Sequence, residues 1–351
     1  MKFIHMADVH LGVQPDKGKP WSEARQQEIK DTFVKVIENA EAKQVDLLLI
    51  AGNLFHMPPS EGMLRDVDYI LSKLTKTKTI IIAGSNDYMK PDSAMANYKF
   101  SSKTICLSAD KISNVYMKDL NTCVTGFSYN DKENEDDILN HIKPAKQGAF
   151  NILLAHGGDE KHIPIQKNQV MSLGYDYVAL GHIHKPQVIV ADRMVYAGAL
   201  EPIDKNDTGP HGYVSGQMSE QGCQIRFVPM ASREYIHLEV QVHKKMTGNE
   251  LRMQIASQIQ ERGIQNIYKV VVTGFRDPDI IFDLEDMDTY GNIIELTDET
   301  RPAYEFEKLM DQNQDNLLGQ YIKSLKDYEE DSIEYMALCE GVQALMETRR
   351  G

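Results

Sequence analysis

The 351-residue sequence predicts an α/β fold, with a largely parallel β-sheet at its centre and a second, more antiparallel sheet beside it. Three observations predict this fold. Strand and helix patterns alternate over the first 110 residues, strand patterns dominate from about 104 to 230, and side chains that can bind metals follow the ends of several strands. Such alternation is typical of layered α/β domains built around a parallel sheet.

The first 110 residues contain a strand–helix–strand–helix–strand series. Short apolar runs at 2–7, 47–51 and 79–83 are typical of strands that are buried on both faces. Between these runs, apolar residues recur at helical spacing over 27–43 and 64–74. Polar residues follow each of the three predicted strands.

The stretch from about 104 to 230 is mostly predicted β-structure. Its apolar or alternating runs are separated by turns that contain Gly and Asp, as strand series usually are. The predicted strands lie at 123–127, 150–155, 177–180, 187–190, 194–196, 213–217 and 224–229. Together with the preceding series they complete a first domain, which we place at residues 1–230.

A small βαβ unit follows, which we place at residues 231–280. Strand patterns at 235–242 and 267–272 flank a helical run at 251–261. The residues at 247–250, Thr-Gly-Asn-Glu, have the spacing of a capping box, in which the first and last side chains each bond the other residue's backbone N–H. This motif predicts the start of the helix.

Residues 281–351 form a predicted acidic helical segment. Leucines at helical spacing between 309 and 325 make an apolar stripe, which serves either a self-packed helical hairpin or the docking of a partner. Thirteen acidic but only four basic residues lie between 295 and 340. Much of the formal net charge of −14 is therefore concentrated here, and the charge does not exclude nucleic-acid binding elsewhere in the chain.

Cysteine usage and hydropathy indicate a cytoplasmic protein. The four cysteines lie far apart and form no CxxC pair, which argues against a zinc ribbon or a disulfide framework and fits a reducing compartment. No apolar run approaches the roughly 18 residues that a membrane-spanning helix needs. The first residues become polar too early for a signal peptide, and we expect no membrane partner.

The polar residues that follow the predicted strands predict a metal site. The carboxyl ends of parallel strands meet at one edge of a sheet, where α/β folds bind ligands. The mixture of nitrogen and oxygen donors suits manganese, iron or zinc better than calcium or magnesium. In chain order, the candidate residues are Asp8 and His10, Asn53 and His56, Ser85 and Asn86, His156, and His182 and His184.

The order of these motifs resembles that of the calcineurin-like metallophosphoesterases. Within that superfamily the chain is most similar to the SbcD family of bacterial DNA-repair exonucleases. The similar segments are FIHMADVHLG at 3–12, GNLFH at 52–56, which is close to the GDLFH of SbcD, and LGHIHKP at 180–186. The resemblance covers roughly residues 1–275 and implies two packed mixed β-sheets flanked by helices, a small capping domain at 231–280 that binds DNA, and a C-terminal helical tail.

The resemblance also implies roles for the candidate residues. In the family two divalent metal ions, usually manganese, bind the scissile phosphate and stabilise the leaving oxygen. Asp8, His10 and His184 would hold one ion, and His156 and His182 the other. Residue 53 would bridge both ions and residue 85 would be a further ligand of the second. Residue 86 would be the general acid, and His56 would position the DNA end or the leaving group.

Three positions depart from the family pattern. Asn53 stands where the bridging Asp is expected, Ser85 where a ligand Asn is expected, and Asn86 where the catalytic His is expected. An amide offers a cation one neutral oxygen instead of a charged carboxylate, and it exchanges no proton near neutral pH. We therefore expect one occupied metal position, at Asp8, His10 and His184.

The function implied by the resemblance is that of a DNA exonuclease subunit in double-strand-break repair. Its expected partners are DNA ends, a second copy of the chain that contacts the helix predicted at 64–74, and an SMC-like coiled-coil ATPase of the SbcC type docked near the C-terminal helices. Two alternatives stay open. One is a phosphodiesterase that acts on a small nucleotide, and the other is a catalytically degenerate subunit that binds DNA ends or serves as a scaffold.

Overall fold

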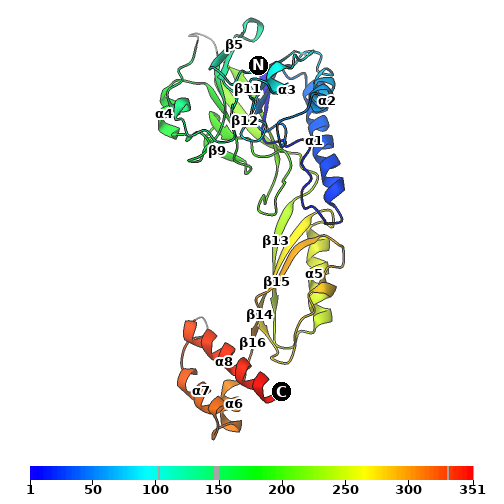
Figure 1. Cartoon of the computed structure of the whole chain (residues 1–351), viewed down its shortest axis with the longest axis vertical. Helices are drawn as coiled ribbons and strands as arrows, with labels where there is room; N and C mark the ends of the chain where they lie inside the picture. Colours follow the sequence, from blue (N-terminus) through cyan, green and yellow to red (C-terminus); the bar gives the residue numbers. More distant parts are fainter. Residues whose placement is uncertain (102, 146–149, 330–331, 351) are drawn as a thin grey trace. The chain divides into compact units, whose positions relative to one another are not determined.

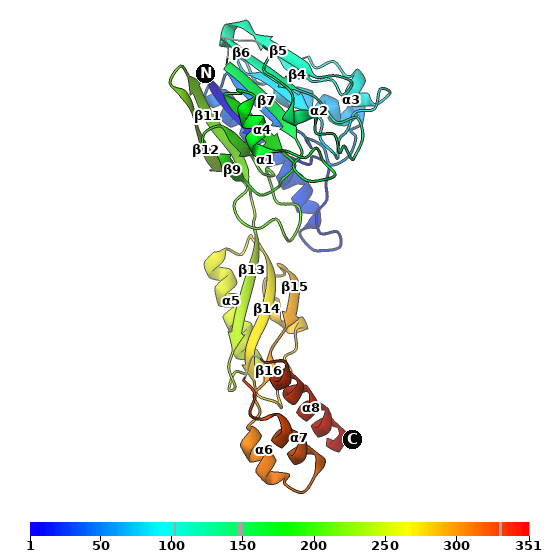
Figure 2. The same ribbon diagram turned by 90° about the vertical axis from the view of Figure 1, so that its left-hand side faces the viewer.

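The computed structural model of the chain describes all residues except 102, 146–149, 330–331 and 351. These residues form two compact units, Met1–Ile236 and His237–Gly351. Figures 1 and 2 show the elements of both units in two perpendicular views. The first unit contains the predicted metal-binding residues and therefore receives most of the description.

The first unit contains a six-stranded mixed sheet. Four of its strands are parallel to one another, because crossover helices connect them, and the hairpin β11–β12 adds two antiparallel strands beside β1. In spatial order the strands are β12 (Gly222–Pro229), β11 (Gly212–Ser219), β1 (Lys2–Met6), β2 (Leu47–Ala51), β3 (Lys78–Ile82) and β4 (Thr104–Cys106).

A second six-stranded sheet comes from the middle of the chain. Its four central strands are parallel, and each edge strand is antiparallel to its neighbour. In spatial order the strands are β5 (Ser113–Met117), β6 (Thr122–Gly126), β7 (Phe150–His156), β8 (Tyr177–Gly181), β10 (Met194–Tyr196) and β9 (Gln187–Val190).

The expectation of a more antiparallel second sheet is wrong. Most of its pairs are parallel, and the hairpin β11–β12 belongs to the first sheet, because β11 pairs with β1 near the start of the chain. A strand pattern shows that a segment is extended but contains no information on which distant strand it will pair with.

The two sheets pack face to face between two layers of helices. Alternate residues of each strand face opposite sides, so Leu47 and Leu49 lie in the core between the sheets, whereas Leu48 and Ile50 lie under the helices. Helices α1 (Ser22–Ala42) and α2 (Glu61–Leu71) cover the outer face of the first sheet, as Figure 1 shows. This arrangement confirms the predicted fold of two packed mixed sheets flanked by helices.

Short helical segments complete the first unit. Val170 of α4 (Lys167–Ser172) and Leu139 of η2 (Ile138–Asn140) pack with Leu153 and Val178 in the core on the outer face of the second sheet. The short segments are α3 (Ala94–Asn97), η1 (Lys118–Leu120), η2 (Ile138–Asn140) and α4 (Lys167–Ser172).

The second unit begins with a small sheet and one helix. Helix α5 begins at the predicted capping box, where Thr247 and Glu250 bond each other's backbone N–H groups. Figure 2 shows β14 between β13 and β15. The elements are β13 (Tyr235–Val242), α5 (Gly248–Arg262), β14 (Ile267–Arg276), η3 (Glu285–Met287), β15 (Ile293–Asp298) and β16 (Arg301–Pro302).

The C-terminal part differs from the acidic helical segment predicted for residues 281–351. Strands β15 and β16 pair with β14, so the small sheet extends beyond residue 280, and the helices start only at α6. The residues Ile-Ile-Glu-Leu-Thr of β15 include three β-branched side chains, which favour strand over helix.

Three C-terminal helices pack against one another. They are α6 (Phe306–Gln312), α7 (Leu317–Leu325) and α8 (Ile333–Arg350), and residues 330–331 of the predicted helical segment lie outside the described residues. Leu318 and Ile322 of α7 form a buried core with Leu338 and Val342 of α8. The leucine stripe is therefore largely used by self-packing. Among the described residues, no helix combines the length and apolar character needed to cross a membrane.

Candidate metal centre

The predicted ligands lie just beyond the carboxyl ends of five parallel strands. Asp8 and Asn53 follow β1 and β2, and Ser85 follows β3 of the same sheet. His156 is the last residue of β7, and His182 follows β8 of the facing sheet. Because both sheets present these ends at the same edge of the sandwich, the fold brings residues from 8 to 184 into one centre.

Several of these residues have a backbone conformation that L-amino acids rarely adopt. The φ angles of Asp8, His10, Asn53 and His182 are 50°, 53°, 50° and 98°. Such a conformation costs about 1–3 kcal/mol for each residue, and residues that adopt it often cluster at functional sites. Backbone hydrogen bonds maintain it here, from Asp8 N to Gly52 O at 3.1 Å and from His10 N to Asn53 O at 3.0 Å.

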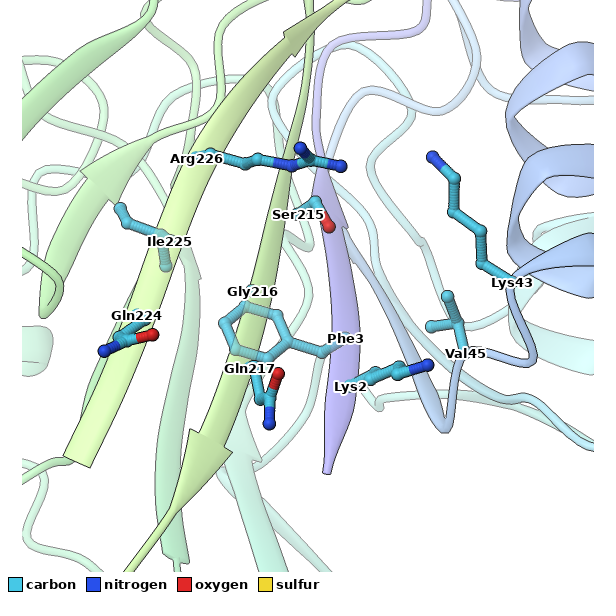
Figure 3. A pocket seen from close by; sticks show the side chains of 10 residues that line it. All are labelled: Lys2, Phe3, Lys43, Val45, Ser215, Gly216, Gln217, Gln224, Ile225 and Arg226. Carbon is cyan, nitrogen blue, oxygen red and sulfur yellow. The ribbon is translucent and has the colours of Figure 1, made fainter. Parts of the chain in front are cut away.

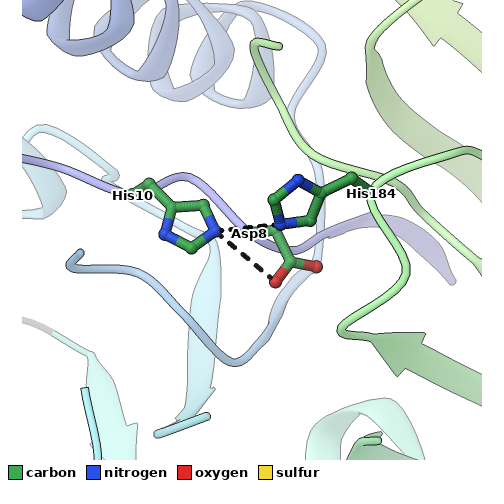
Figure 4. A group of neighbouring side chains, drawn as sticks. All are labelled: Asp8, His10 and His184. Carbon is green, nitrogen blue, oxygen red and sulfur yellow. Dashed lines mark hydrogen bonds and ion pairs between the residues drawn. The ribbon is translucent and has the colours of Figure 1, made fainter. Parts of the chain in front are cut away.

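Asp8, His10 and His184 form a compact group (Figure 4). One donor atom from each residue lies within 4.8 Å of the others. The Nε2 atoms of His10 and His184 are 3.2 Å apart, and the nearer Asp8 oxygen is 3.9 Å from His10 Nε2. A buried carboxylate and two imidazole nitrogens that converge in this way fit one divalent cation.

Charge and burial prepare this group for a cation. Burial lowers the pKa of His10 to about 3, so its imidazole is neutral and has a lone pair for a metal. Burial alone raises the pKa of Asp8, but attraction to His156, His184 and His10 outweighs it and lowers that pKa. Asp8 therefore supplies a negative charge at neutral pH.

Asp207, which the sequence analysis missed, orients His184. His184 Nδ1 donates to the Asp207 carboxylate at 3.0 Å, and this bond directs the opposite nitrogen toward His10. Burial lowers the pKa of His184, but the hydrogen bond to Asp207 and the charge of Asp8 more than compensate and raise it. A carboxylate behind a metal-binding histidine is a common supporting contact, and the two aspartates at 204 and 207 were the available signal.

Both ends of the Asn53 side-chain amide form hydrogen bonds to neighbouring residues. Its amide nitrogen donates to Asp8 Oδ1 at 3.0 Å, and its amide oxygen accepts from the backbone N–H of Asn86 at 2.8 Å. An NH₂ group therefore faces Asp8, where a bridging carboxylate would face a cation. In this arrangement Asn53 does not fit the role of a bridge between two metals.

Ser85 and His156 lie together on the side of the centre away from His10. Ser85 Oγ is 3.4 Å from His156 Nε2, and His156 Nδ1 donates to the backbone oxygen of Ala51 at 2.9 Å. Burial lowers the pKa of His156 to about 4. His156 is therefore a neutral imidazole beside a weak neutral ligand, Ser85, and Asp8 is the charged group that acts most strongly on it.

Asn86 and His56 connect two loops of the centre. The side-chain amide of Asn86 donates to the backbone oxygen of His56 at 3.0 Å, so the residue has a structural hydrogen bond where the family pattern has an acid. His56 Nδ1 lies 3.3 Å from His10 Nδ1. Burial, together with the positive charges of His184 and Lys17, lowers the pKa of His56.

Asp87 is a second residue that the sequence analysis did not single out. Its buried carboxylate accepts backbone N–H bonds from Gly84 at 2.7 Å, Phe55 at 3.1 Å and Asn53 at 3.2 Å. Burial raises the pKa of this carboxyl to about 6, although the three donors oppose the rise. Asp87 ties the loop after β3 to the loop after β2.

His182 has a partner outside the predicted set. Its backbone N–H donates to Asp8 at 2.8 Å, which links it to the first group. Its side-chain Nε2, however, donates to Asp159 at 2.7 Å, and Asp159 also accepts from His162. Asp159 and His162 are not among the residues predicted from the sequence, although they lie three residues apart and just after His156.

A hollow on the outer surface of the first sheet lies apart from this centre (Figure 3). It is lined by the start of β1, including Lys2 and Phe3, and by residues of β11 and β12. Asp8 lies beyond the opposite end of β1, so this hollow contributes nothing to the metal-binding group.

Comparison with known proteins places the chain in a family. The family model described as calcineurin-like phosphoesterase matches residues 1–186, which is more than half of the chain. The chain belongs to this family. The membership confirms the coarser resemblance drawn from the motifs, and the matched range contains every predicted metal-binding residue.

The similar curated proteins include relatives named for DNA repair. A protein named DNA double-strand break repair protein Mre11 from Archaeoglobus fulgidus is 23% identical over 281 residues, 69% of this chain and 62% of that protein. An uncharacterised metallophosphoesterase, YhaO of Bacillus subtilis, is 26% identical over 241 residues, 61% of this chain and 56% of that protein. The chain thus spans less than two thirds of the length of these relatives.

A further curated protein and a solved structure are also similar to the chain. The Mre11 protein of Sulfolobus acidocaldarius is 25% identical over 272 residues, 70% of this chain and 67% of that protein. A solved structure described as a dimetal phosphatase from Danio rerio aligns with a TM-score of 0.40 and 11% identity, over 66% of this chain and 99% of that one.

Proposed function

We propose that the chain is a phosphodiesterase of the SbcD type that acts on DNA ends and depends on a divalent metal, manganese above all. The observation that carries this proposal is the group formed by Asp8, His10 and His184, in a chain of the calcineurin-like phosphoesterase family. The similarity to proteins named for double-strand-break repair supports DNA as the substrate class.

We assign a separate role to each residue in and around this group. Asp8, His10 and His184 hold the cation, and Asp207 keeps the His184 ring in the required orientation. When bound, a divalent cation supplies Lewis-acid chemistry that stabilises the negative charge developing on a phosphate. His56, beside His10, is the side chain that we assign to positioning the DNA end or the leaving group, and Asn86 cannot titrate as a general acid would.

A second candidate function is DNA-end binding without cleavage. The observation that favours it is the orientation of Asn53, whose amide donates to Asp8 in place of bridging two cations. The neutral Asn86 points the same way, since a general acid contributes typically about 10²–10⁴-fold to the rate of such reactions. In this case the chain has the fold and binds a cation at Asp8, His10 and His184 but does not hydrolyse DNA.

A nuclease assay on linear duplex DNA with manganese tests the proposal. The full chain is compared with a variant carrying Asn53→Asp, Ser85→Asn and Asn86→His, and with Asp8→Ala as a control for contaminating nuclease. The proposal expects manganese-dependent cleavage by the unaltered chain and none by Asp8→Ala. If only the triple variant cleaves while the unaltered chain still binds DNA, end binding is the function. If the unaltered chain neither cleaves nor binds DNA, both candidates are wrong.

The expected protein partners also belong to this proposal. Exposed apolar side chains remain on the C-terminal helices after self-packing, including Leu317 and Ile333, and we assign this surface to a coiled-coil ATPase of the SbcC type. Tyr69 on α2 and Met57 are exposed in the first unit, and we assign them to a homodimer contact. Light scattering of the chain and of Tyr69→Glu tests the dimer. Co-elution with an SbcC-type coiled coil, compared between the chain and Leu317→Glu, tests the partner.

A further inference from the structure

Asp159, His162 and His182 form a second group of potential ligands, separate from Asp8, His10 and His184. His162 Nδ1 lies 2.8 Å from Asp159 Oδ1, and His182 Nε2 lies 2.7 Å from Asp159 Oδ2. One donor atom from each residue lies within 4.8 Å of the others, and the two imidazole rings are 4.4 Å apart. The side chains are 48%, 19% and 14% exposed, so a dissolved ion can reach them.

The loop after β7 holds this group in place. Gly157 and Gly158 have φ angles of +145° and +139°, which allow the chain to turn directly after His156. Gly158 N then donates to His162 O at 2.7 Å, and Asn134 N from a distant loop donates to Lys161 O at 2.9 Å. The buried Ile163 that follows has a φ of 41°, a rare conformation for a β-branched residue. These constraints position both Asp159 and His162 before any ligand binds.

The residues expected to hold a second cation do not fit that role. Asn53 donates to Asp8, and Ser85 is a weak neutral ligand beside His156. His182, in contrast, bonds the carboxylate of Asp159. The negative charge that is missing at position 53 is therefore present on the other side of His182, next to a further imidazole.

We infer that the His182 side of the centre binds a divalent transition-metal ion through Asp159, His162 and His182. Two imidazoles and one carboxylate, with room for a solvent ligand, are a set that zinc uses in open sites and that manganese also accepts. The ion binds His162 Nδ1 and His182 Nε2, the nitrogens that now face Asp159, and each neutral imidazole keeps its single proton on its other ring nitrogen. The inference deepens the proposed function by naming a second cation site, but it concerns ion binding and not cleavage.

The main competing arrangement uses the same histidine differently. In that arrangement Asp159 is not a ligand but a supporting contact that orients His182, and His182 binds an ion on the side that faces His156. Removing Asp159 weakens metal binding in both arrangements, because supporting carboxylates also contribute about 10–100-fold to affinity. Removing His162 separates the two, since only the inferred site uses that imidazole as a ligand.

The test counts bound ions in the full chain. The chain is stripped with chelator, dialysed against Zn²⁺ and in parallel Mn²⁺, and analysed by elemental emission and by titration calorimetry. His162→Ala and Asp159→Asn are compared with Asp8→Ala. The matched control is His141→Ala, because His141 forms an exposed pair with Asp137 at 3.1 Å that resembles the Asp159 contact but lies outside the group.

We expect two ions bound per chain. Asp8→Ala should lose one of them, and His162→Ala and Asp159→Asn should each lose the other or bind it at least about tenfold more weakly. His141→Ala should bind both ions as the unaltered chain does. Circular dichroism verifies that each variant is folded. Two ions retained in His162→Ala, or a single ion that depends only on Asp8, overturns the inference. Two ions without DNA cleavage would overturn only the proposed hydrolysis, and cleavage with one ion would overturn only this inference.

Discussion

The two sides of the candidate metal centre are built from the same kinds of strand ends but differ in their contacts. On one side Asp8, His10 and His184 converge as charged and neutral ligands, with Asp207 supporting His184. On the other side, Asn53 and Ser85 form hydrogen bonds with neighbouring protein groups. The difference shows that one fold can keep three converging ligands on one side of the centre while the ligands on the other side change.

The largest effect should separate these two sides directly. Asp8→Asn removes the buried carboxylate of the first group, and we expect its affinity for Mn²⁺ to fall by more than about 100-fold, because even supporting residues contribute about 10–100-fold. His156→Gln on the other side should leave this first affinity within a few-fold. Titration calorimetry at constant ionic strength measures both. Equal losses in the two variants would show that the sides form one inseparable site.

A second prediction concerns the residue between the two sides. Asn53→Asp places a second carboxylate where the amide now donates to Asp8 at 3.0 Å. In the absence of metal, a lost buried hydrogen bond and like-charge repulsion should lower the free energy of unfolding by about 1–3 kcal/mol. Saturating Mn²⁺ should reverse this loss and stabilise the variant more than the unaltered chain.

Thermal unfolding with chelator and with Mn²⁺ measures this reversal. Asn53→Ala is the matched variant, because it also removes the hydrogen bond but adds no charge and should gain no extra stabilisation from the ion. If Asn53→Asp is no less stable than the unaltered chain in chelator, the amide contact with Asp8 does not exist in solution.

A third, smaller effect should come from the support behind His184. Asp207→Asn keeps a similar shape but removes the charge that accepts from His184 Nδ1. We expect the affinity of the first group for Mn²⁺ to fall by about 10–100-fold. Asp204→Asn, in the same loop, serves as the control, because Asp204 accepts from Asn206 and not from His184. Similar losses in both variants would indicate a general charge effect and not orientation of the ring.

The smallest effect should follow from Ser85→Ala. The Ser85 hydroxyl lies 3.4 Å from His156 Nε2, which is a long contact for a hydrogen bond. We expect a change in the free energy of unfolding below about 1 kcal/mol and no change in the number of bound ions. Chemical denaturation and ion counting measure these quantities. Loss of an ion in this variant would mean that Ser85 is a ligand after all.

Much of the first unit was predictable because its signals are local. The apolar runs of β2 and β3, each followed by polar residues, predict buried strands with a site at their ends, and the structure contains both strands. The motifs at the strand ends also include Asp8, His10 and His184, and the family resemblance assigned these three residues to one ion. The structure places one donor atom of each within 4.8 Å of the others. The capping box at Thr247 is local in the same sense, because its partners are three residues apart.

Other features required the tertiary structure, because they depend on contacts between distant parts of the chain. The placement of the β11–β12 hairpin follows from pairing with β1, and the sheet position of β15 follows from pairing with β14. The bonds of Asn53 to Asp8 and of His182 to Asp159 join residues 45 and 23 positions apart. Periodicity and spacing report which face of an element a residue occupies, but they do not report which distant side chain it meets.

By itself, the sequence determined the layered α/β fold and the chemical types available at the strand ends. The folded structure decided which of these side chains meet. Asn53 donates a hydrogen bond to Asp8, and His182 and His162 both bond the carboxylate of Asp159. The reason is physical. Strand and helix formation depend mainly on local patterns of apolar residues, whereas the ligand set of a metal centre depends on which loops the packing of two sheets brings together.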